Sequence, residues 1–320
     1  MTATLWPLMR KVALISPYGA TSPDAYEQCL RRLKTLGIEV VTSPHLNHRY
    51  RYLAGRVEER LHDLYWAFEQ PDIDAVWCLR GGYGAAQLIE HIEWSRLARA
   101  RTLPLVGYSD ITALLVAFDA HGLRAIHGST ATELNRLALA DPDVISTTRW
   151  QSLASIRRAV YREAGQFTVM SGPEQVIEGK LTGGNLTVLA SLCGTPAALK
   201  LEGPSILLLE DVQEAFYALE RSFVQLLQSV DTTQIKAICL GEFTDCKGPR
   251  DTPELLPIFR EWATPLGIPV FAGLALGHDG NNQAFALGAD AQLSSTGISW
   301  SSVKQSIDTP PTSLTQPLLK

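Results

Sequence analysis

The 320-residue chain lacks the features that mark secreted, nucleic-acid-binding and membrane proteins. Its five cysteines are an odd, scattered set with no C-x-x-C pair, which argues against a disulfide framework. Lys and Arg total 28 against 33 Asp and Glu, so a net charge of −5 provides no basic field for nucleic acid. Charged residues interrupt every apolar run before it could span a bilayer, and the first ten residues lack a secretory apolar region. We therefore expect a reduced, cytoplasmic protein without nucleic-acid or membrane partners.

What remains is the composition of an ordinary globular enzyme, with 46% hydrophobic and 19% charged residues. The length favours two domains, each able to bury a core. From residue 11 to about 140, strand-like apolar runs alternate with helical stretches, which predicts an N-terminal doubly wound parallel sheet. The strand-like runs are 11–17, 38–41, 74–79, 104–107 and 125–128, and the helical stretches are 24–36, 51–70 and 87–92.

The second half of the chain has a different pattern. In 141–178, where we place a linker, turn residues surround a helix expected near 152–160, and short strands then mix with helices over 179–307. This predicts an α/β fold in which the N-terminal domain, 1–140, is followed by a smaller β-rich α/β C-terminal domain, with the active site in the cleft between them. The proline-rich tail, 308–320, is expected to be poorly ordered.

Small and polar residues lie at the carboxyl ends of three predicted strands, at 16–17, 81–82 and 109–110. In an open parallel sheet, ligands bind at the carboxyl ends of the strands, so these residues are expected to share one crevice. The stretch 105–112 has the outline of a strand, a tight turn and a helix, with Ser109 at the turn. Such a turn exposes a nucleophile and aims a helix N-terminus at it. The match is partial, because Ile111 stands where the usual elbow has glycine, and Ser109 or Asp110 as a helix cap stays open.

Two residues of the second half could serve such a serine. Glu210 is predicted as the last residue of an apolar strand, where a carboxylate is costly unless it has a partner. The following Asp211 is interpreted as a cap for the next helix. His278 lies in a Gly/Asn-rich loop after a strand, the kind of place that often holds catalytic groups, and His127 at a strand end is the competing candidate.

The chain order Ser109, Glu210, His278 matches one known order of a serine–acid–histidine triad. In that arrangement the acid orients the imidazole, the imidazole takes the serine proton, and the serine attacks a carbonyl. The developing oxyanion needs N–H donors, which the backbone of Gly81 and Gly82 and the amide of Asp110 could supply.

The glycine loop after residue 80 could instead cradle a phosphate, but its spacing fits neither nucleotide fingerprint. The pair His45-x-x-His48 lies in a loop flanked by proline and lacks an H-E-x-x-H context. We therefore expect neither a metal nor a cofactor.

Short motifs follow one another in order from about residue 11 to 290, over nearly the whole chain. They are Ser16-Pro17, Ala54-Gly55, Glu59-Arg60 with Asp63-Leu64, Arg80-Gly81-Gly82-Tyr83-Gly84, Gly107 to Thr112, Gly183-Gly184-Asn185-Leu186, Leu209-Glu210-Asp211, Glu220-Arg221, and Gly273 with Gly277-His278. This ordered set resembles the serine LD-carboxypeptidases, which are the muramoyltetrapeptide carboxypeptidases with their microcin-immunity relatives.

The resemblance implies catalysis by Ser109, Glu210 and His278, with the oxyanion hole at the amides of Gly82 and Asp110 and substrate contacts at Gly81 and Tyr83. It implies a cytoplasmic enzyme, often a homodimer, that removes the terminal D-alanine of murein tetrapeptide during cell-wall recycling. The immunity relatives cut a peptidyl-nucleotide antibiotic with the help of an aromatic side chain, for which Trp150 is the candidate here. A small-molecule-binding α/β protein, in which Ser109 is only a cap, is the non-catalytic alternative.

Overall fold

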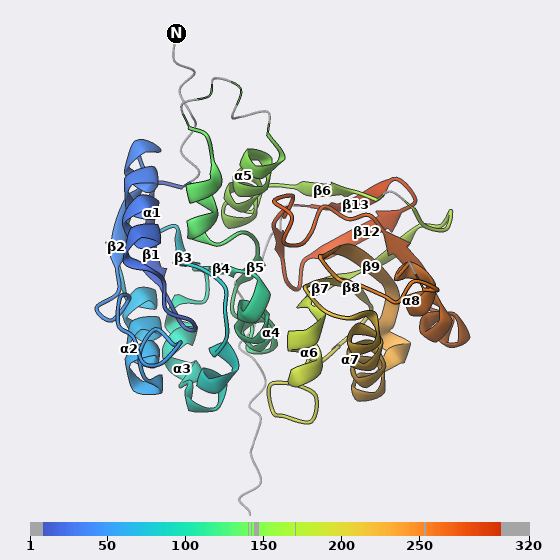
Figure 1. Cartoon of the computed structure of the whole chain (residues 1–320). Helices are drawn as coiled ribbons and strands as arrows, with labels where there is room; N and C mark the ends of the chain where they lie inside the picture. The colour runs from blue at the N-terminus through green and yellow to red at the C-terminus, as the bar shows by residue number, and fades with distance from the viewer. Residues whose placement is uncertain are drawn as a thin grey trace, which may run out of the picture.

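The chain forms two β-sheets with helices packed around them (Figure 1). The computed structural model describes residues 9–139, 141, 143, 147–169, 171–252 and 254–301, so the predicted tail at 308–320 lies outside the described residues. The helices are α1 (Pro23–Thr35), α2 (Val57–Phe68), α3 (Trp94–Leu97), α4 (Thr112–Ala120), α5 (Thr148–Val160), α6 (Leu186–Ser191), α7 (Phe216–Ser229) and α8 (Leu256–Ala263). Short 3-10 turns are η1 (Ala85–His91), η2 (Ala98–Ala100), η3 (Ser109–Ile111), η4 (Ala131–Arg136), η6 (Thr232–Gln234) and η7 (Thr264–Leu266).

The first sheet has the strand order β11-β5-β4-β3-β1-β2 and is parallel except at one edge. Five of its strands come from the first half of the chain, as predicted. The sixth, β11, arrives from far along the chain and pairs antiparallel with β5. The strands are β1 (Lys11–Ile15), β2 (Glu39–Thr42), β3 (Ala75–Cys78), β4 (Leu105–Gly107), β5 (Ala125–His127) and β11 (Phe285–Ala286).

Helices cover both faces of this sheet, which confirms the doubly wound prediction. Alternate residues of a strand point to opposite faces, and β1 shows the consequence. Ala13 and Ile15 pack with α2 and α4, whereas Val12 and Leu14 pack with α1. The inner strands β3 and β4 are therefore buried along their whole length, and β1 from Val12 on, whereas the edge strand β2 is only partly buried.

The second sheet has the order β10-β9-β8-β7-β12-β13-β6. Its strands from β10 to β7 pair in parallel, and those from β7 to β6 pair antiparallel, which agrees with the β-rich pattern expected of the second half. None of the helices in the described part of the chain is long and apolar enough to cross a bilayer. The strands are β6 (Gly165–Thr168), β7 (Ile177–Asn185), β8 (Ser205–Val212), β9 (Ile235–Thr244), β10 (Val270–Ala272), β12 (Asp290–Ser294) and β13 (Gly297–Trp300).

The segment 141–178, predicted as a linker, contains α5 and β6. Helix α5 packs against β5 and β11 of the first sheet, and strand β6 pairs with β13 of the second sheet. A helix in this segment was expected, but the strand was not. The exact division into domains stays a prediction.

Helix α4 lies where the two halves meet (Figure 1). Its residues 112–118 are all buried, and it contacts β4 and β5 on one side and β7 and α6 on the other. A helix that is apolar all round belongs in a core, and each fully buried Leu or Phe contributes about 1.5–3 kcal/mol relative to exposure. Because Ser109 lies just before this helix, the predicted nucleophile is held at the seam between the two sheets.

Candidate active site

The turn that carries Ser109 is strained. Strand β4 ends at Gly107, Tyr108 is extended with φ −153°, and Ser109 then takes φ +63° before the chain enters η3 and α4. A non-glycine residue in the left-handed region costs free energy and persists only when the surroundings enforce it. The half-buried serine thus stands at a sharp strand-to-helix turn of the nucleophile-elbow kind.

Ile111 occupies the position where the usual elbow has its second glycine. Its side chain packs on Gly107, where an added Cβ would lie only 2.9 Å from the isoleucine Cγ2. The missing side chain of Gly107 therefore allows strand β4 and the following helix to approach closely. Ile111 fills the space that would be empty if a second glycine stood at its position.

The cap interpretation of this turn is wrong for both residues. The N-cap positions of η3 and α4 are Tyr108 and Ile111, neither with a side-chain capping bond, and the carboxylate of Asp110 accepts a hydrogen bond from the amide of Ala85 at 2.9 Å. Asp110 therefore caps η1, a helical turn in a different part of the sequence. Burial raises the pKa of Asp110 to about 6, opposed by the Ala85 amide and by the charge of Arg60.

The glycine loop lies directly against the serine. A Cβ added to Gly81 would sit 3.3 Å from the Oγ of Ser109. Gly82 follows with φ +151°, and its amide donates to no other residue in the described part of the chain. The predicted loop and the predicted nucleophile are thus neighbours, while the assignment of Gly82 and Asp110 to an oxyanion hole stays a prediction.

Arg60, which was noted in a sequence motif but given no role, braces this loop. Arg60 is only 1% exposed, and its Nη1 donates to the carbonyls of Pro17 and Gly84 at 2.9 Å each. The helical periodicity of α2 places Arg60 on the buried face of the helix. An arginine on that face was the signal in the sequence that could have indicated its role. Its guanidinium ties two strand-end loops of the first sheet together.

Glu210 and His278 form the partner pair that the sequence analysis expected. The Nδ1 of His278 lies 2.7 Å from the Oε2 of Glu210, and the carboxylate is fully buried. Burial alone would lower the pKa of His278, but the hydrogen bond and the charge of Glu210 raise it overall. Burial raises the pKa of Glu210, whereas the hydrogen bond and the charge of the His278 imidazole act to lower it.

Glu210 is not the last residue of its strand. β8 continues to Val212, and its pairing with β9 shifts register between Leu209 and Asp211. Such bulges re-aim side chains and are frequent beside active sites. The bulge provides the physical reason why a carboxylate in the middle of a buried strand meets a loop histidine.

His278 also reaches the serine turn. Its ring lies 4.8 Å, between centroids, from the ring of Tyr108, the residue that precedes Ser109. A second carboxylate, Glu242 on β9, accepts a hydrogen bond from the amide of Asp279 and holds the loop from the other side. Burial raises the pKa of Glu242, and the carboxylates of Asp279 and Glu210 add to that rise. The structure thus gathers the serine turn, the glycine loop and the acid–histidine pair at one place.

The competing histidine is unsuited to act as the base. His127 is completely buried at the end of β5, its ring stacks on Phe285, and neither ring nitrogen has a hydrogen-bond partner among the described residues. Burial, helped by the nearby His278, lowers its pKa to about 3. It is a neutral core residue close to the site.

Asp211 does cap a helix, but a different one from that expected. Its carboxylate accepts hydrogen bonds from the amide and hydroxyl of Thr187, in the first turn of α6, and from the side chain of Asn185. The amide of Asn185 in turn donates to the Oγ1 of Thr112 at 3.0 Å. This last bond joins the start of α6 to the start of α4, and so connects the two halves of the chain beside the site.

Two aromatic residues were predicted to contact ligands. Trp150 is the third residue of α5, only 7% exposed, and packs in the core beneath the first sheet, so it offers no free face to a nucleotide base. Tyr83 is 57% exposed and touches the ring of Tyr52 edge-on. Its contact with a substrate stays a prediction.

Family models and relatives match the chain over most of its length. A model described as the LD-carboxypeptidase N-terminal domain matches residues 12–128, and one described as the LD-carboxypeptidase C-terminal domain matches residues 178–293. Murein tetrapeptide carboxypeptidase of Pseudomonas aeruginosa is 46% identical over 299 residues, which are 93% of this chain and 97% of that protein. A probable murein peptide carboxypeptidase of Bacillus subtilis is 29% identical, over 88% of each chain.

Solved structures agree. Muramoyltetrapeptide carboxypeptidase from Oxalobacter formigenes superposes with a TM-score of 0.79 at 29% identity, covering 90% of this chain and 97% of that one. The microcin C7 self-immunity protein MccF in its wild-type apo state gives a TM-score of 0.80 at 18% identity, over 94% of this chain and 98% of that one. At that identity the second likeness shows the shared fold alone.

Proposed function

The chain belongs to the LD-carboxypeptidase family, and on that premise we propose that it cleaves the L,D-peptide bond before the C-terminal D-alanine of murein tetrapeptide. The name of the Pseudomonas relative supports this substrate. The observation that carries the chemistry is the 2.7 Å bond between Glu210 and His278, placed beside the strained turn of Ser109.

In the proposed mechanism, Glu210 holds the Nδ1–H of His278 and leaves Nε2 free to take the proton of the Ser109 hydroxyl. The serine oxygen attacks the carbonyl carbon of the scissile bond, and the imidazolium then protonates the departing amine of D-alanine. Water, activated by the same imidazole, hydrolyses the acyl-enzyme. No step requires a metal or a cofactor.

The amides of Gly82 and Asp110 would stabilise the tetrahedral oxyanion. One lies in the glycine loop that touches Ser109, and the other belongs to the second residue of η3, just before the buried helix, so both come from backbone next to the serine. We assign the D-alanine carboxylate to backbone amides near Gly81 and Ser109, with Tyr83 as a further substrate contact, which would explain removal of a terminal residue. A C-terminally amidated peptide that is cut as fast as the free acid would count against this contact.

The domain roles follow from the same proposal. The N-terminal domain supplies the nucleophile and the oxyanion donors, and the C-terminal domain supplies the acid and the base. A cytoplasmic location and a homodimer remain predictions from the family resemblance. The immunity-type alternative loses its one residue of support with the burial of Trp150. The cap-only alternative loses its basis because Ser109 is the N-cap of neither η3 nor α4.

The test is Ser109→Ala, assayed by release of D-alanine from a diaminopimelyl-D-alanine peptide. Loss of the nucleophile of a triad is expected to lower kcat by about 10⁴-fold or more. Circular dichroism and the melting temperature report whether the variant is folded. A folded variant that keeps its activity would refute the assignment of the nucleophile.

A further inference from the structure

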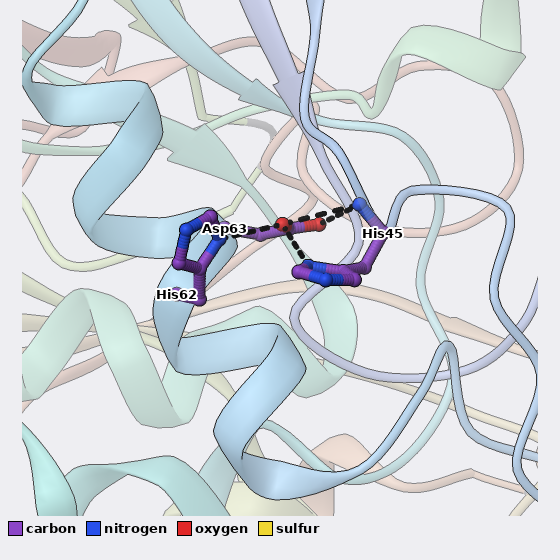
Figure 2. A group of neighbouring side chains, drawn as sticks. All are labelled: His45, His62 and Asp63. Atoms are coloured by element: carbon purple, nitrogen blue, oxygen red, sulfur yellow. Dashed lines mark hydrogen bonds and ion pairs between the residues drawn. The ribbon is translucent and has the colours of Figure 1, made fainter.

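Two histidines and an aspartate form a cluster away from the active site, which we call the histidine cluster: His45, His62 and Asp63. The Nδ1 of His45 lies 2.8 Å, and the Nδ1 of His62 3.5 Å, from the same oxygen of Asp63. Figure 2 shows the carboxylate between the two imidazole rings, one from the loop after β2 and the other from α2. His62 and Asp63 lie 17 and 18 positions after His45 in the sequence, so the local pattern around His45 does not reveal them as its neighbours.

The carboxylate of Asp63 is fixed in this position by other groups. The side chain is only 6% exposed, and its Oδ2 accepts a hydrogen bond from the hydroxyl of Ser43 at 2.7 Å. The amide of His45 donates to both carboxylate oxygens, at 3.1 and 3.2 Å. These bonds leave Oδ1 directed at the two imidazoles, as outer-shell hydrogen bonds orient the ligands of metal sites.

We infer that the histidine cluster binds one divalent transition-metal ion of the Zn²⁺ class. Two imidazole nitrogens and one carboxylate oxygen are ligands that Zn²⁺ accepts, and the imidazoles disfavour Mg²⁺ and Ca²⁺. One ligand atom from each residue lies within 4.8 Å of the other two, so an ion with bonds of about 2.0–2.1 Å would draw the three atoms closer together. The His62 side chain is 57% exposed, which gives the ion access from solvent.

A second triad shares His45 and includes His48 and Glu59. The carboxylate of Glu59 belongs to the cap of α2, where it accepts the amide of Arg56 at 2.7 Å, and it lies 2.9 Å from Nδ1 of His48. Its side chain is also 32% exposed, against 6% for Asp63. We therefore assign the ion to the histidine cluster, and His48 becomes the matched control.

The ion would have a structural effect. It would fasten the loop after β2 to the helix α2, whose Arg60 braces the strand-end loops next to the active site. The proposed hydrolysis does not use the ion, so the two proposals fail or hold independently.

The experiment titrates ZnCl₂ into the full-length, tag-free protein after chelator treatment, by calorimetry. Visible absorption of a Co²⁺ complex then reports nitrogen and oxygen ligands, and the absence of a thiolate band excludes the cysteines. One ion per chain is expected, with a rise in melting temperature. His62→Ala should weaken binding by tenfold or more, His48→Ala should bind as the wild type does, and Ser43→Ala should weaken binding about 10–100-fold.

The inference is overturned if the wild-type protein binds no Zn²⁺, if His62→Ala binds as tightly as wild type, or if His48→Ala loses the ion. The last result would move the site to the second triad. D-Alanine release measured with and without chelator separates this result from the proposed function, because activity is expected to persist without the ion.

Discussion

The two sheets contribute to the candidate active site in different ways. The first provides mostly backbone, through a serine in a strained turn and a loop of glycines whose missing side chains allow close approach. The second provides side chains, through a buried carboxylate at a bulge and the histidine that it holds. The difference teaches that a nucleophile turn needs rigid main chain, whereas proton transfer needs a tuned pair of titratable groups.

The strongest test of this division removes the charge that the second sheet supplies. Glu210→Gln keeps the size of the side chain but cannot stabilise the imidazolium, so kcat for D-alanine release is expected to fall about 10³–10⁴-fold with a much smaller change in KM. Steady-state kinetics on the peptide substrate give both constants. An effect on KM alone would make Glu210 a substrate ligand.

The pH dependence of the reaction tests the tuning of the same pair. His278 accepts a proton only when neutral, and Glu210 raises its pKa above the ordinary 6.5. As the pH falls through the raised pKa, kcat/KM should decrease about tenfold per unit, with its midpoint above 6.5. In Glu210→Gln the midpoint should move to lower pH. A midpoint that is the same in both proteins would contradict the role of the carboxylate.

A smaller effect is expected at the bond that joins the halves. Thr112→Val removes the acceptor of the Asn185 amide and leaves that amide buried, at a cost of about 1–3 kcal/mol in the free energy of unfolding. Thr182→Val is the matched control, because the buried hydroxyl of Thr182 has no partner among the described residues. Urea unfolding measures both variants, and equal losses would show that the bond contributes nothing specific.

The smallest effect is expected at the histidine that the first sheet buries. His127→Leu removes two ring nitrogens that have no partner in the described structure, so the free energy of unfolding should change by less than about 1.5 kcal/mol. The kcat should stay near the wild-type value. A collapse of kcat in a folded variant would reopen the choice between His127 and His278.

The sequence was sufficient for the parallel sheet and for the three strand-end features that converge, because hydrophobic periodicity and strand polarity are local signals. The partners of the capping acids were not predictable. Asp110 and Asp211 were correctly seen as acids able to cap, yet each caps a helix other than the one that follows it. Such choices depend on distant segments that meet only after folding.

The two-residue strand β11 was missed for a related reason. Phe285 and Ala286 carry no periodicity of their own, and their register is set by pairing with β5. The same limit hid the histidine cluster, whose members come from a loop and from a helix.

The pairing of β11 with β5 has a consequence for the order of events during synthesis. The ribosome releases the serine turn and the glycine loop early, but the strand that completes their sheet begins only at Phe285, seven residues after His278. Until that point β5 lacks its antiparallel neighbour, and the proposed base, His278, has emerged only shortly before. On the proposed mechanism, a growing chain therefore cannot hydrolyse peptides before residues 278–286 have emerged and folded onto the first sheet.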